Sequence, residues 1–289
     1  MKIFYKKSGQ ALWQSLVLVM LLLAGFPALA QEQAPLRFGI LPFNSTLALI
    51  KTHQPLRQFL QARLGQPVEI FTAPDYPTFL REQLQGNYDL MITAPHFALM
   101  ALDKGYVPLY HYQARLEPIM VVRKEDPATD PKGLQGRRIA MANRVAFASI
   151  AGLKWLGDKG MKPGQDFTIL DKPTHGAAIA AVAVGDADGA ITTTTLLGQV
   201  PGDIRQRLRY FSSGIRLPHV VTMAHKRLGD GEIRRIKEAL LAFAAAPEGQ
   251  AFFKETAYIG FEELSPDELA TFKPYLAPLK QLMDQSHSQ

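Results

Sequence analysis

The 289-residue sequence contains no cysteine. Disulfide bonds, lipid attachment through a cysteine, thiolate metal ligands and cysteine nucleophiles are therefore excluded, and stability must come from buried apolar side chains. After position 31, no apolar run approaches the ~20 residues that a helix needs to cross a membrane. The sequence also has no low-complexity segment and no short-period repeat.

The longest apolar run lies at residues 16–26. Three lysines precede it and the small-x-small sequence Ala28-Leu29-Ala30 follows it, which is the pattern of a secretory signal peptide. At about 11 residues, the run is roughly half of a membrane span. We expect residues 1–30 to be a signal peptide cleaved after Ala30, giving a periplasmic protein that begins at Gln31. An uncleaved membrane anchor is the alternative.

The net charge of +6 comes partly from this N-terminal segment. Removing residues 1–30 takes away three lysines and no acid, which lowers Lys+Arg from 32 to 29 against 26 Asp+Glu. The remaining net charge of about +3 argues only weakly for an anionic partner, and we expect no binding of nucleic acid.

Apolar runs that resemble strands alternate with helical stretches along the chain. The predicted strands are 36–41, 68–72, 90–93, 108–112, 119–123, 137–141, 167–170, 190–193 and 220–224. The predicted helices are a stretch with Pro55 in its first turn and Gly65 as its stop, then 77–85, 95–104, 146–159, 174–185 and 232–246, with only helix expected after Asp230. Such alternation predicts an α/β protein with mostly parallel sheets and helices on both faces.

The α/β pattern starts twice, with an isolated apolar run at each change. This organisation predicts two lobes: residues 31–118 and 225–289 form lobe 1, and residues 119–224 form lobe 2. We expect hinges at about 118–119 and 224–225 that let the lobes close on a ligand. One continuous doubly wound domain is the alternative.

No enzyme signature is present. The sequence lacks a Walker loop, Gly-x-Gly-x-x-Gly after a strand, Gly-x-Ser-x-Gly and His-Glu-x-x-His. The seven histidines are scattered, without the helical spacing of paired metal ligands. We therefore expect no catalytic residues, no metal site and no cofactor.

The informative residues lie at the predicted strand-to-helix turns, where open α/β sheets bind ligands. Hydroxyl, amide and imidazole groups and one guanidinium occur there, a set that suits a small oxyanion. The candidate ligand-binding residues at these turns are Asn44, Ser45, Tyr76, Thr93, His96, Asn143, Arg144 and His175.

Each candidate also has a simpler interpretation. Asn44 and Ser45 are good helix N-caps, as is Thr174. Tyr76 fits a rim position, His96 a buried histidine with its hydrogen bonds satisfied, and Arg144 a solvated side chain. We place His175 at the centre of the site, because a helix N-terminus disfavours a cation that binds nothing.

At this point the chain resembles a known family, the substrate-binding proteins of phosphate, phosphite and phosphonate ABC transporters, which have the two-lobed type II periplasmic-binding fold. The resemblance covers nearly all of the chain after position 31. It rests on the order and spacing of 36–40, 55–65, 73–76, 88–96, 134–140, and His175 followed by 181–188. It implies that Tyr76 and His175 contact the ligand.

Two departures from the family pattern affect the ligand. The Ser-Thr-Ser-Gly-type loop of the family is replaced by residues 142–147 (Ala-Asn-Arg-Val-Ala-Phe), and the family's acidic positions by the threonines 192–195. From this last stretch we take Thr193 and Thr194 as candidate ligand-binding residues. A site with an arginine and no carboxylate favours a fully ionised anion over an aminophosphonate.

The sequence predicts a monomeric periplasmic solute-binding protein that delivers a small oxyanion to an ABC permease. We expect His175, Arg144 and Tyr76 to converge on the ligand, with Thr93 and Asn44 contributing from lobe 1. A receptor of the same fold that works with a membrane sensor kinase is the alternative. An exported enzyme with His175 as general base is a third reading.

Overall fold

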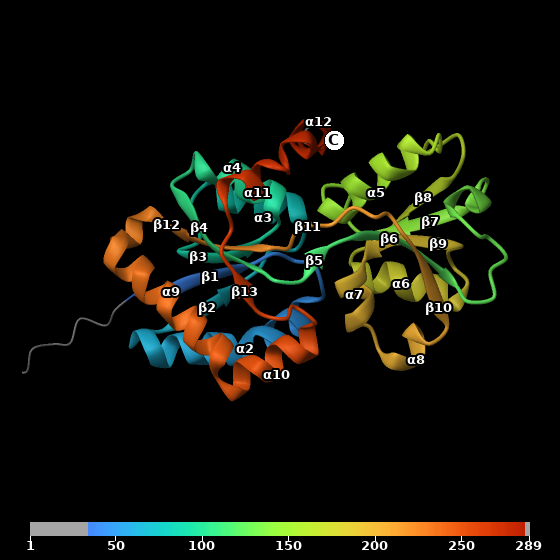
Figure 1. Ribbon diagram of the computed structural model, residues 1–289. Helices are drawn as coiled ribbons and strands as arrows, with labels where there is room; N and C mark the ends of the chain where they lie inside the picture. The colour runs from blue at the N-terminus through green and yellow to red at the C-terminus, as the bar shows by residue number, and fades with distance from the viewer. Residues whose placement is uncertain (1–33, 287–289) are drawn as a thin grey trace, which may run out of the picture. The chain divides into compact units, whose positions relative to one another are not determined.

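The computed structural model describes residues 34–286; the predicted signal peptide and its cleavage site lie outside them. Apart from one two-stranded ribbon, the strands form two separate sheets (Figure 1). The first sheet has the order β13 (Phe261–Glu262), β4 (Tyr106–Tyr112), β12 (Val221–His225), β3 (Leu90–Thr93), β1 (Leu36–Ile40) and β2 (Val68–Phe71). The second has the order β10 (Leu208–Ser212), β6 (Pro118–Arg123), β9 (Gly189–Thr193), β7 (Arg138–Met141) and β8 (Thr168–Asp171).

Both sheets are mixed, because each combines parallel and antiparallel strand pairs. In the first sheet, β1 runs parallel to β2 and β3, whereas β12 runs antiparallel to β3 and β4. In the second, β7 runs parallel to β8 and β9, whereas β6 runs antiparallel to β9 and β10. A short, fully buried apolar run carries no signal of strand direction, so the sequence pattern missed the antiparallel members.

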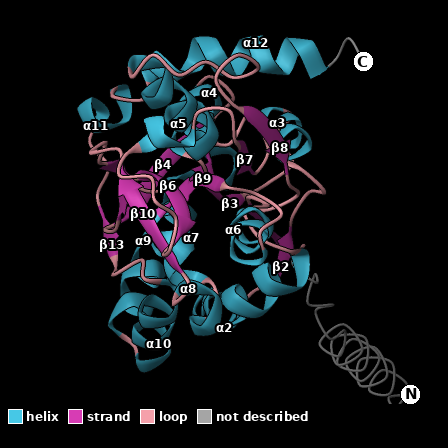
Figure 2. Cartoon of the chain, turned by 90° about the vertical axis from the view of Figure 1, so that its right-hand side faces the viewer, coloured by secondary structure: helices cyan, strands magenta, loops and turns pink. Residues whose placement is uncertain are grey.

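Helices cover both faces of each sheet (Figures 1 and 2). The first sheet lies between one group of helices, α2 (Thr46–Leu64), α9 (Gly229–Ala245) and α10 (Pro247–Thr256), and a second group, α3 (Tyr76–Leu84), α4 (Pro95–Leu102), α11 (Pro266–Ala270) and α12 (Leu276–Ser286). The second sheet lies between α5 (Phe147–Asp158) and the group α6 (His175–Val184), α7 (Thr194–Gln199) and α8 (Gly202–Arg205). Short 3₁₀ helices occupy Pro131–Leu134, Lys226–Leu228 and Lys273–Tyr275.

The largest apolar core joins the first sheet to the start of α5. It contains buried residues of the first sheet together with Phe147 and Ile150 of α5. The Phe147 ring lies 5.3 Å from that of Phe272 and 4.9 Å from that of Tyr275 (ring centroids), both near the C-terminus. Two smaller clusters lie on the second sheet. The C-terminal residues Phe272 and Tyr275 therefore pack both in the core of the first sheet and against α5, which covers the second sheet.

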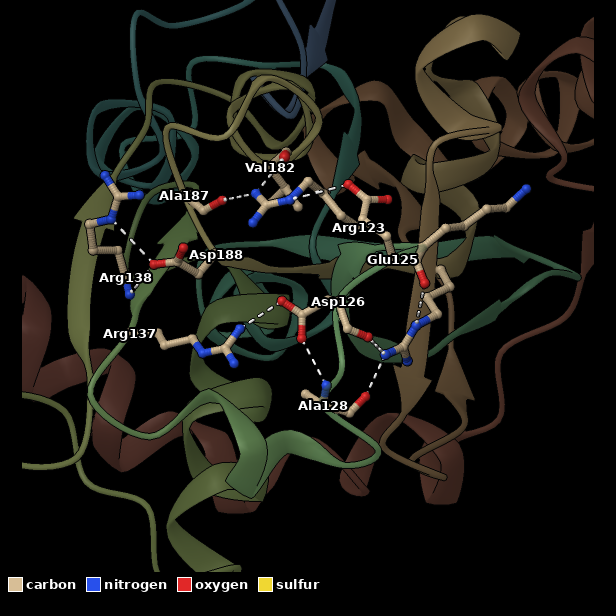
Figure 3. Close-up of polar contacts among 11 residues, drawn as sticks. Arg123, Glu125, Asp126, Ala128, Arg137, Arg138, Val182, Ala187 and Asp188 are labelled. Carbon is tan, nitrogen blue, oxygen red and sulfur yellow. Dashed lines mark hydrogen bonds and ion pairs between the residues drawn. The ribbon is translucent and has the colours of Figure 1, made fainter.

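An arginine-rich network closes the outer end of the second sheet, where β7 and β9 begin (Figure 3). Arg137 contacts the carboxylate of Asp126 at 2.6 Å, and Arg138 contacts that of Asp188 at 3.2 Å. Arg123 donates to the carbonyl oxygens of Val182 and Ala187. These bonds tie the loops after β6 and α6 to the start of β7.

A two-stranded ribbon carries the chain between the sheets. It consists of β5 (Arg115–Leu116) and β11 (Leu217–Pro218), which pair antiparallel. The lobe boundaries at 118–119 and 224–225 remain predictions, but β12 pairs entirely within the first sheet. The return of the chain thus precedes Val221.

Three local expectations differ from the structure. Pro55 lies inside α2 and not in its first turn, because the helix already begins at Thr46, where the Ser45 side chain caps it. β10 and β13 were not expected, and β13 interrupts the predicted all-helical C-terminus. A two-residue edge strand shows no alternation, so only its partner β4 reveals it. Pro77 and Pro95 are confirmed as first-turn prolines.

Candidate functional site

A cavity of about 40 Å³ lies where both sheets end in strand-to-helix turns. Leu41 follows β1 and Ala94 follows β3, while Ala146 follows β7 and Thr193 ends β9. The complete lining is Leu41, Phe43, Tyr76, Ala94, Pro95, Leu116, Ala146, Phe147, Ala148, His175, Thr193, Leu196, His219, Val220 and Tyr258. Both sheets and the crossing segments therefore contribute to one central cavity.

Helices α4 and α5 begin at the central cavity without a side-chain cap. Their N-cap residues are Ala94 and Ala146, whereas Asp75 caps the neighbouring α3. Within residues 34–286, no acceptor meets the N–H groups of Phe147 and Ala148 at the start of α5. Free N–H groups and the positive end of a helix dipole attract anions.

His175 is the first residue of α6 and lines the cavity. Its side chain is buried, and Nδ1 lies 3.3 Å from Oγ1 of Thr192. Burial lowers the pKa of His175 to about 4. The ring is therefore neutral at pH 7 and acts as a hydrogen-bonding group instead of a cation.

Tyr76 and Thr193, both candidate ligand-binding residues from the sequence, also line the cavity. Tyr76 is buried at the start of α3, and burial raises its pKa above the usual value, so the hydroxyl stays protonated. Oγ1 of Thr193 caps α7 and lies 3.1 Å from Oγ1 of Thr195. Thr194 does not line the cavity; its amide donates to the Glu117 carbonyl at 3.2 Å.

His219 is a cavity residue that the sequence reasoning missed. It follows the ribbon strand β11, and its Nε2 lies 3.0 Å from Oγ1 of Thr195. Its Nδ1 is buried and has no partner among the described residues. Burial lowers the pKa of His219 to about 3. The only sequence signal was a histidine inside the apolar run 217–224, away from any strand-to-helix turn.

Arg144 does not converge with His175 and Tyr76, contrary to the prediction. Its Nε and Nη2 donate to the Asp171 carboxylate at 3.0 and 2.8 Å. Both side chains line a separate outer cleft of about 700 Å³. Parallel pairing of β7 with β8 places Met141 opposite Asp171, which brings the two loops together. Asn143 lines the same cleft, and its Oδ1 accepts from the amide of Val145 at 3.0 Å.

Thr93 and His96 are buried outside the cavity lining. Oγ1 of Thr93 donates to Oε1 of Gln83 at 2.5 Å. Nε2 of His96 lies 2.9 Å from the carbonyl oxygen of Val145, a contact that joins the turn after β3 to the turn after β7. Burial lowers the pKa of His96 to about 4, so this histidine is neutral too.

Asn44 and Ser45 mainly organise the start of α2. Oδ1 of Asn44 accepts from the Ser45 amide at 2.9 Å, and Oγ of Ser45 accepts from the Ala48 amide at 3.4 Å. Asn44 also lines a second cavity of about 200 Å³, which shares Phe43 and Leu196 with the central one. The simpler interpretation as capping residues therefore describes the contacts of both.

Several solved structures are similar to this fold. PhnD1 from Prochlorococcus marinus (MIT 9301) in complex with methylphosphonate has a TM-score of 0.74 at 14% identity, covering 85% of this chain and 98% of that chain. A binding protein component of an ABC phosphonate transporter from Pseudomonas aeruginosa has a TM-score of 0.71 at 16% identity, covering 88% and 99%. A histidine kinase sensor domain with similarity to periplasmic binding proteins has a TM-score of 0.55 at 16% identity, covering 81% and 99%.

These likenesses define the class of the fold as a two-lobed type II periplasmic binding protein. A protein-family model, described as the phosphonate periplasmic substrate-binding protein of an ABC transporter, matches residues 38–269. The chain belongs to this family of periplasmic solute-binding proteins, which bind a small ligand and work with an ABC permease. Among the described residues, no helix is long and apolar enough to cross a membrane, and no cluster of potential metal ligands occurs in residues 34–286.

Proposed function

We propose that this protein captures a small oxyanion, such as a phosphonate, phosphite or phosphate, in the central cavity and delivers it to an ABC permease. The observation that carries the proposal is the pair of uncapped helix N-termini. Helices α4 and α5 come from different sheets, yet both begin at the same cavity with alanine N-caps. An oxyanion placed there accepts from free N–H groups that otherwise have no acceptor within residues 34–286.

Neutral side chains complete the proposed site. His175 and Tyr76 offer polar groups from opposite lobes, and His219, whose buried Nδ1 has no partner among the described residues, lines the same cavity. No lysine, arginine, aspartate or glutamate belongs to the cavity lining. The ligand charge is therefore balanced by oriented dipoles, which cost little reorganisation on binding.

Closure of the lobes is part of the proposal. The volume of about 40 Å³ is small beside the ~300–1,000 Å³ of pockets that hold drug-sized ligands. A phosphonate therefore enters only when the lobes separate. Solution scattering with and without a binding oxyanion tests this step, and an unchanged radius of gyration would contradict it.

Titration calorimetry with phosphate, phosphite and methylphosphonate tests the site. The parent protein should bind at least one of them, and a ligand at ~100 times its Kd should raise the free energy of unfolding by about 2.7 kcal/mol. His175→Ala and His219→Ala should each weaken binding by roughly one to two decades, the size of a lost charge-assisted hydrogen bond.

The His225→Ala variant, at a partly buried histidine outside the cavity lining, is the matched control and should bind like the parent. Full affinity in both His175→Ala and His219→Ala would place the anion elsewhere. Recovery of the ligand unchanged by ³¹P NMR separates binding from the enzyme reading.

The transporter and sensor readings share every feature of the cavity and differ in the membrane partner. The family assignment supports the transporter, whereas the sensor reading has only the fold likeness in its favour. Stimulation of the ATPase of the cognate permease in proteoliposomes is expected. Signalling to a kinase without such stimulation would favour the sensor.

The mature protein is proposed to be a periplasmic monomer that begins at Gln31. Intact-mass measurement and light scattering on the periplasmic fraction check both points. Full-length protein in the inner membrane would revive the anchor alternative.

A further inference from the structure

The turn between α10 and β13 carries unusual backbone conformations beside the cavity. Ala257 has φ 60° and Ile259 has φ 73°, and no other non-glycine residue within 34–286 has a positive φ. The Gly260 amide donates to the Tyr258 carbonyl at 2.9 Å, which closes a three-residue turn around Ile259. A β-branched residue is disfavoured in this region, and such backbone strain concentrates at functional sites.

The residue between the two strained positions is Tyr258, which lines the cavity. Its ring stacks on that of Tyr112, with centroids 4.2 Å apart and planes inclined by 10°. Tyr112 in turn stacks on Phe261 at 5.3 Å. The centroid of the Tyr258 ring also lies 5.1 Å from that of His219, whose Nδ1 has no hydrogen-bond partner among the described residues. Tyr258 is therefore the outermost ring of a three-ring stack that ends at the ligand site.

The backbone of this turn is held from both sides of the molecule. The Tyr258 carbonyl also accepts from the Ala114 amide at 3.1 Å, and the Gly260 carbonyl accepts from Gln113 at 2.9 Å. From the second lobe, Nε2 of Gln199 donates to the Thr256 carbonyl at 2.9 Å. By contrast, Phe43, another aromatic residue of the lining, borders both the central cavity and the second cavity. The ring of Tyr258 is therefore held more firmly than that of Phe43.

We propose that Tyr258 determines ligand specificity by limiting the size of the group attached to the oxyanion, and that the strained turn at Ile259 positions its ring. The inference rests on the proposed function, because it assumes that the oxyanion head lies at the N-termini of α4 and α5. The remaining lining is largely apolar, so the substituent of the ligand packs against it. A fixed ring then excludes long substituents sterically.

A series of alkylphosphonates, from methyl to butyl, with inorganic phosphite as the reference, tests this proposal by calorimetry. The parent should bind the short members, at most fourfold more tightly per CH₂ that is buried (about 0.8 kcal/mol), and should lose affinity sharply at propyl or butyl. Tyr258→Ala should improve butylphosphonate binding at least tenfold relative to methylphosphonate. Tyr258→Phe keeps the ring and should retain the parent profile.

Ile259→Gly tests the positioning role without touching the ring. Glycine accepts a positive φ, so the turn persists but the ring is less firmly held. We expect the ratio of methyl to butyl affinity to fall while phosphite affinity stays within about twofold. Tyr210→Ala, an exposed tyrosine on the edge strand β10, is the matched control and should not change the profile.

The outcomes distinguish the inference from the proposed function. If the length profile of folded Tyr258→Ala and Ile259→Gly equals that of the parent, while His175→Ala weakens every member, the role of Tyr258 is refuted and the oxyanion site stands. If Tyr258→Ala fails to fold, Ile259→Gly decides alone. Absence of binding of all tested anions to the parent refutes the proposed function itself.

Discussion

The two ends of the second sheet use opposite chemistry. At the outer end, Arg123, Arg137 and Arg138 contact carboxylates and backbone carbonyl oxygens. At the cavity end, the lining offers backbone N–H groups, hydroxyls and neutral imidazoles. The arginines of this lobe thus stabilise loops, and the proposed anion site relies on dipoles. A positive residue at a ligand-facing turn is therefore a poor guide to where an anion binds in this chain.

The largest expected effect comes from lowering the pH, because the buried histidines, two of which line the cavity, are neutral in the folded protein. Burial lowers the pKa of His53, His96 and His175 to about 4, and that of His219 to about 3, below the value of 6.5 in the unfolded chain. The unfolded state therefore binds more protons, and stability that is present above pH 6.5 is lost as pH falls through 4. The slope is about 1.4 kcal/mol per pH unit for each histidine.

Thermal and urea unfolding between pH 7 and 4 measure this slope. His175→Gln should reduce this slope by about 1.4 kcal/mol per pH unit, the contribution of one proton. His225→Gln should reduce it less, since His225 is only partly buried. A parent slope that is unchanged in His175→Gln would mean that the ring is protonated in the folded state.

An intermediate effect is expected from removing one ion pair of the arginine network at the outer end of the second sheet. Arg137→Ala leaves the Asp126 carboxylate, which is 2% exposed, with the Ala128 amide as its remaining polar contact. We expect a loss of about 2–3 kcal/mol in the free energy of unfolding, with unchanged phosphite binding. Arg138→Ala is the matched control; its ion pair is half-exposed and should contribute less than about 1 kcal/mol. A loss of ligand affinity in Arg137→Ala would show that the two ends are coupled.

The smallest effect is expected for Arg144→Ala. Arg144 and Asp171 are both about half exposed, so the pair should contribute less than about 1 kcal/mol to stability. Because Arg144 lines the outer cleft, phosphite affinity should change less than about threefold. A tenfold loss by calorimetry would restore the original prediction that Arg144 reaches the ligand on closure.

The sequence predicted the features that depend on residues close together in the chain, such as strands and strand-to-helix turns. β3 was predicted with its observed bounds, and Tyr76 and His175, which the strand–helix alternation put at predicted turns, line the cavity. The missed features depend on residues far apart in the chain. Arg144 pairs with Asp171 only because β7 lies beside β8, and Tyr258 reaches the cavity only because its turn is bonded to residues 113–114. A local pattern contains neither fact.

The ribbon of β5 and β11 limits how the lobes can move. Leu116 pairs with Leu217 and Arg115 with Pro218, so the two segments that connect the sheets form one antiparallel ribbon. Such a ribbon can bend out of its plane, whereas sliding one strand along the other breaks the hydrogen bonds between them. The proposed closure of the lobes should therefore bend the ribbon and not shear it. His219, which follows the returning strand directly and lines the cavity, connects the ribbon to the proposed ligand site.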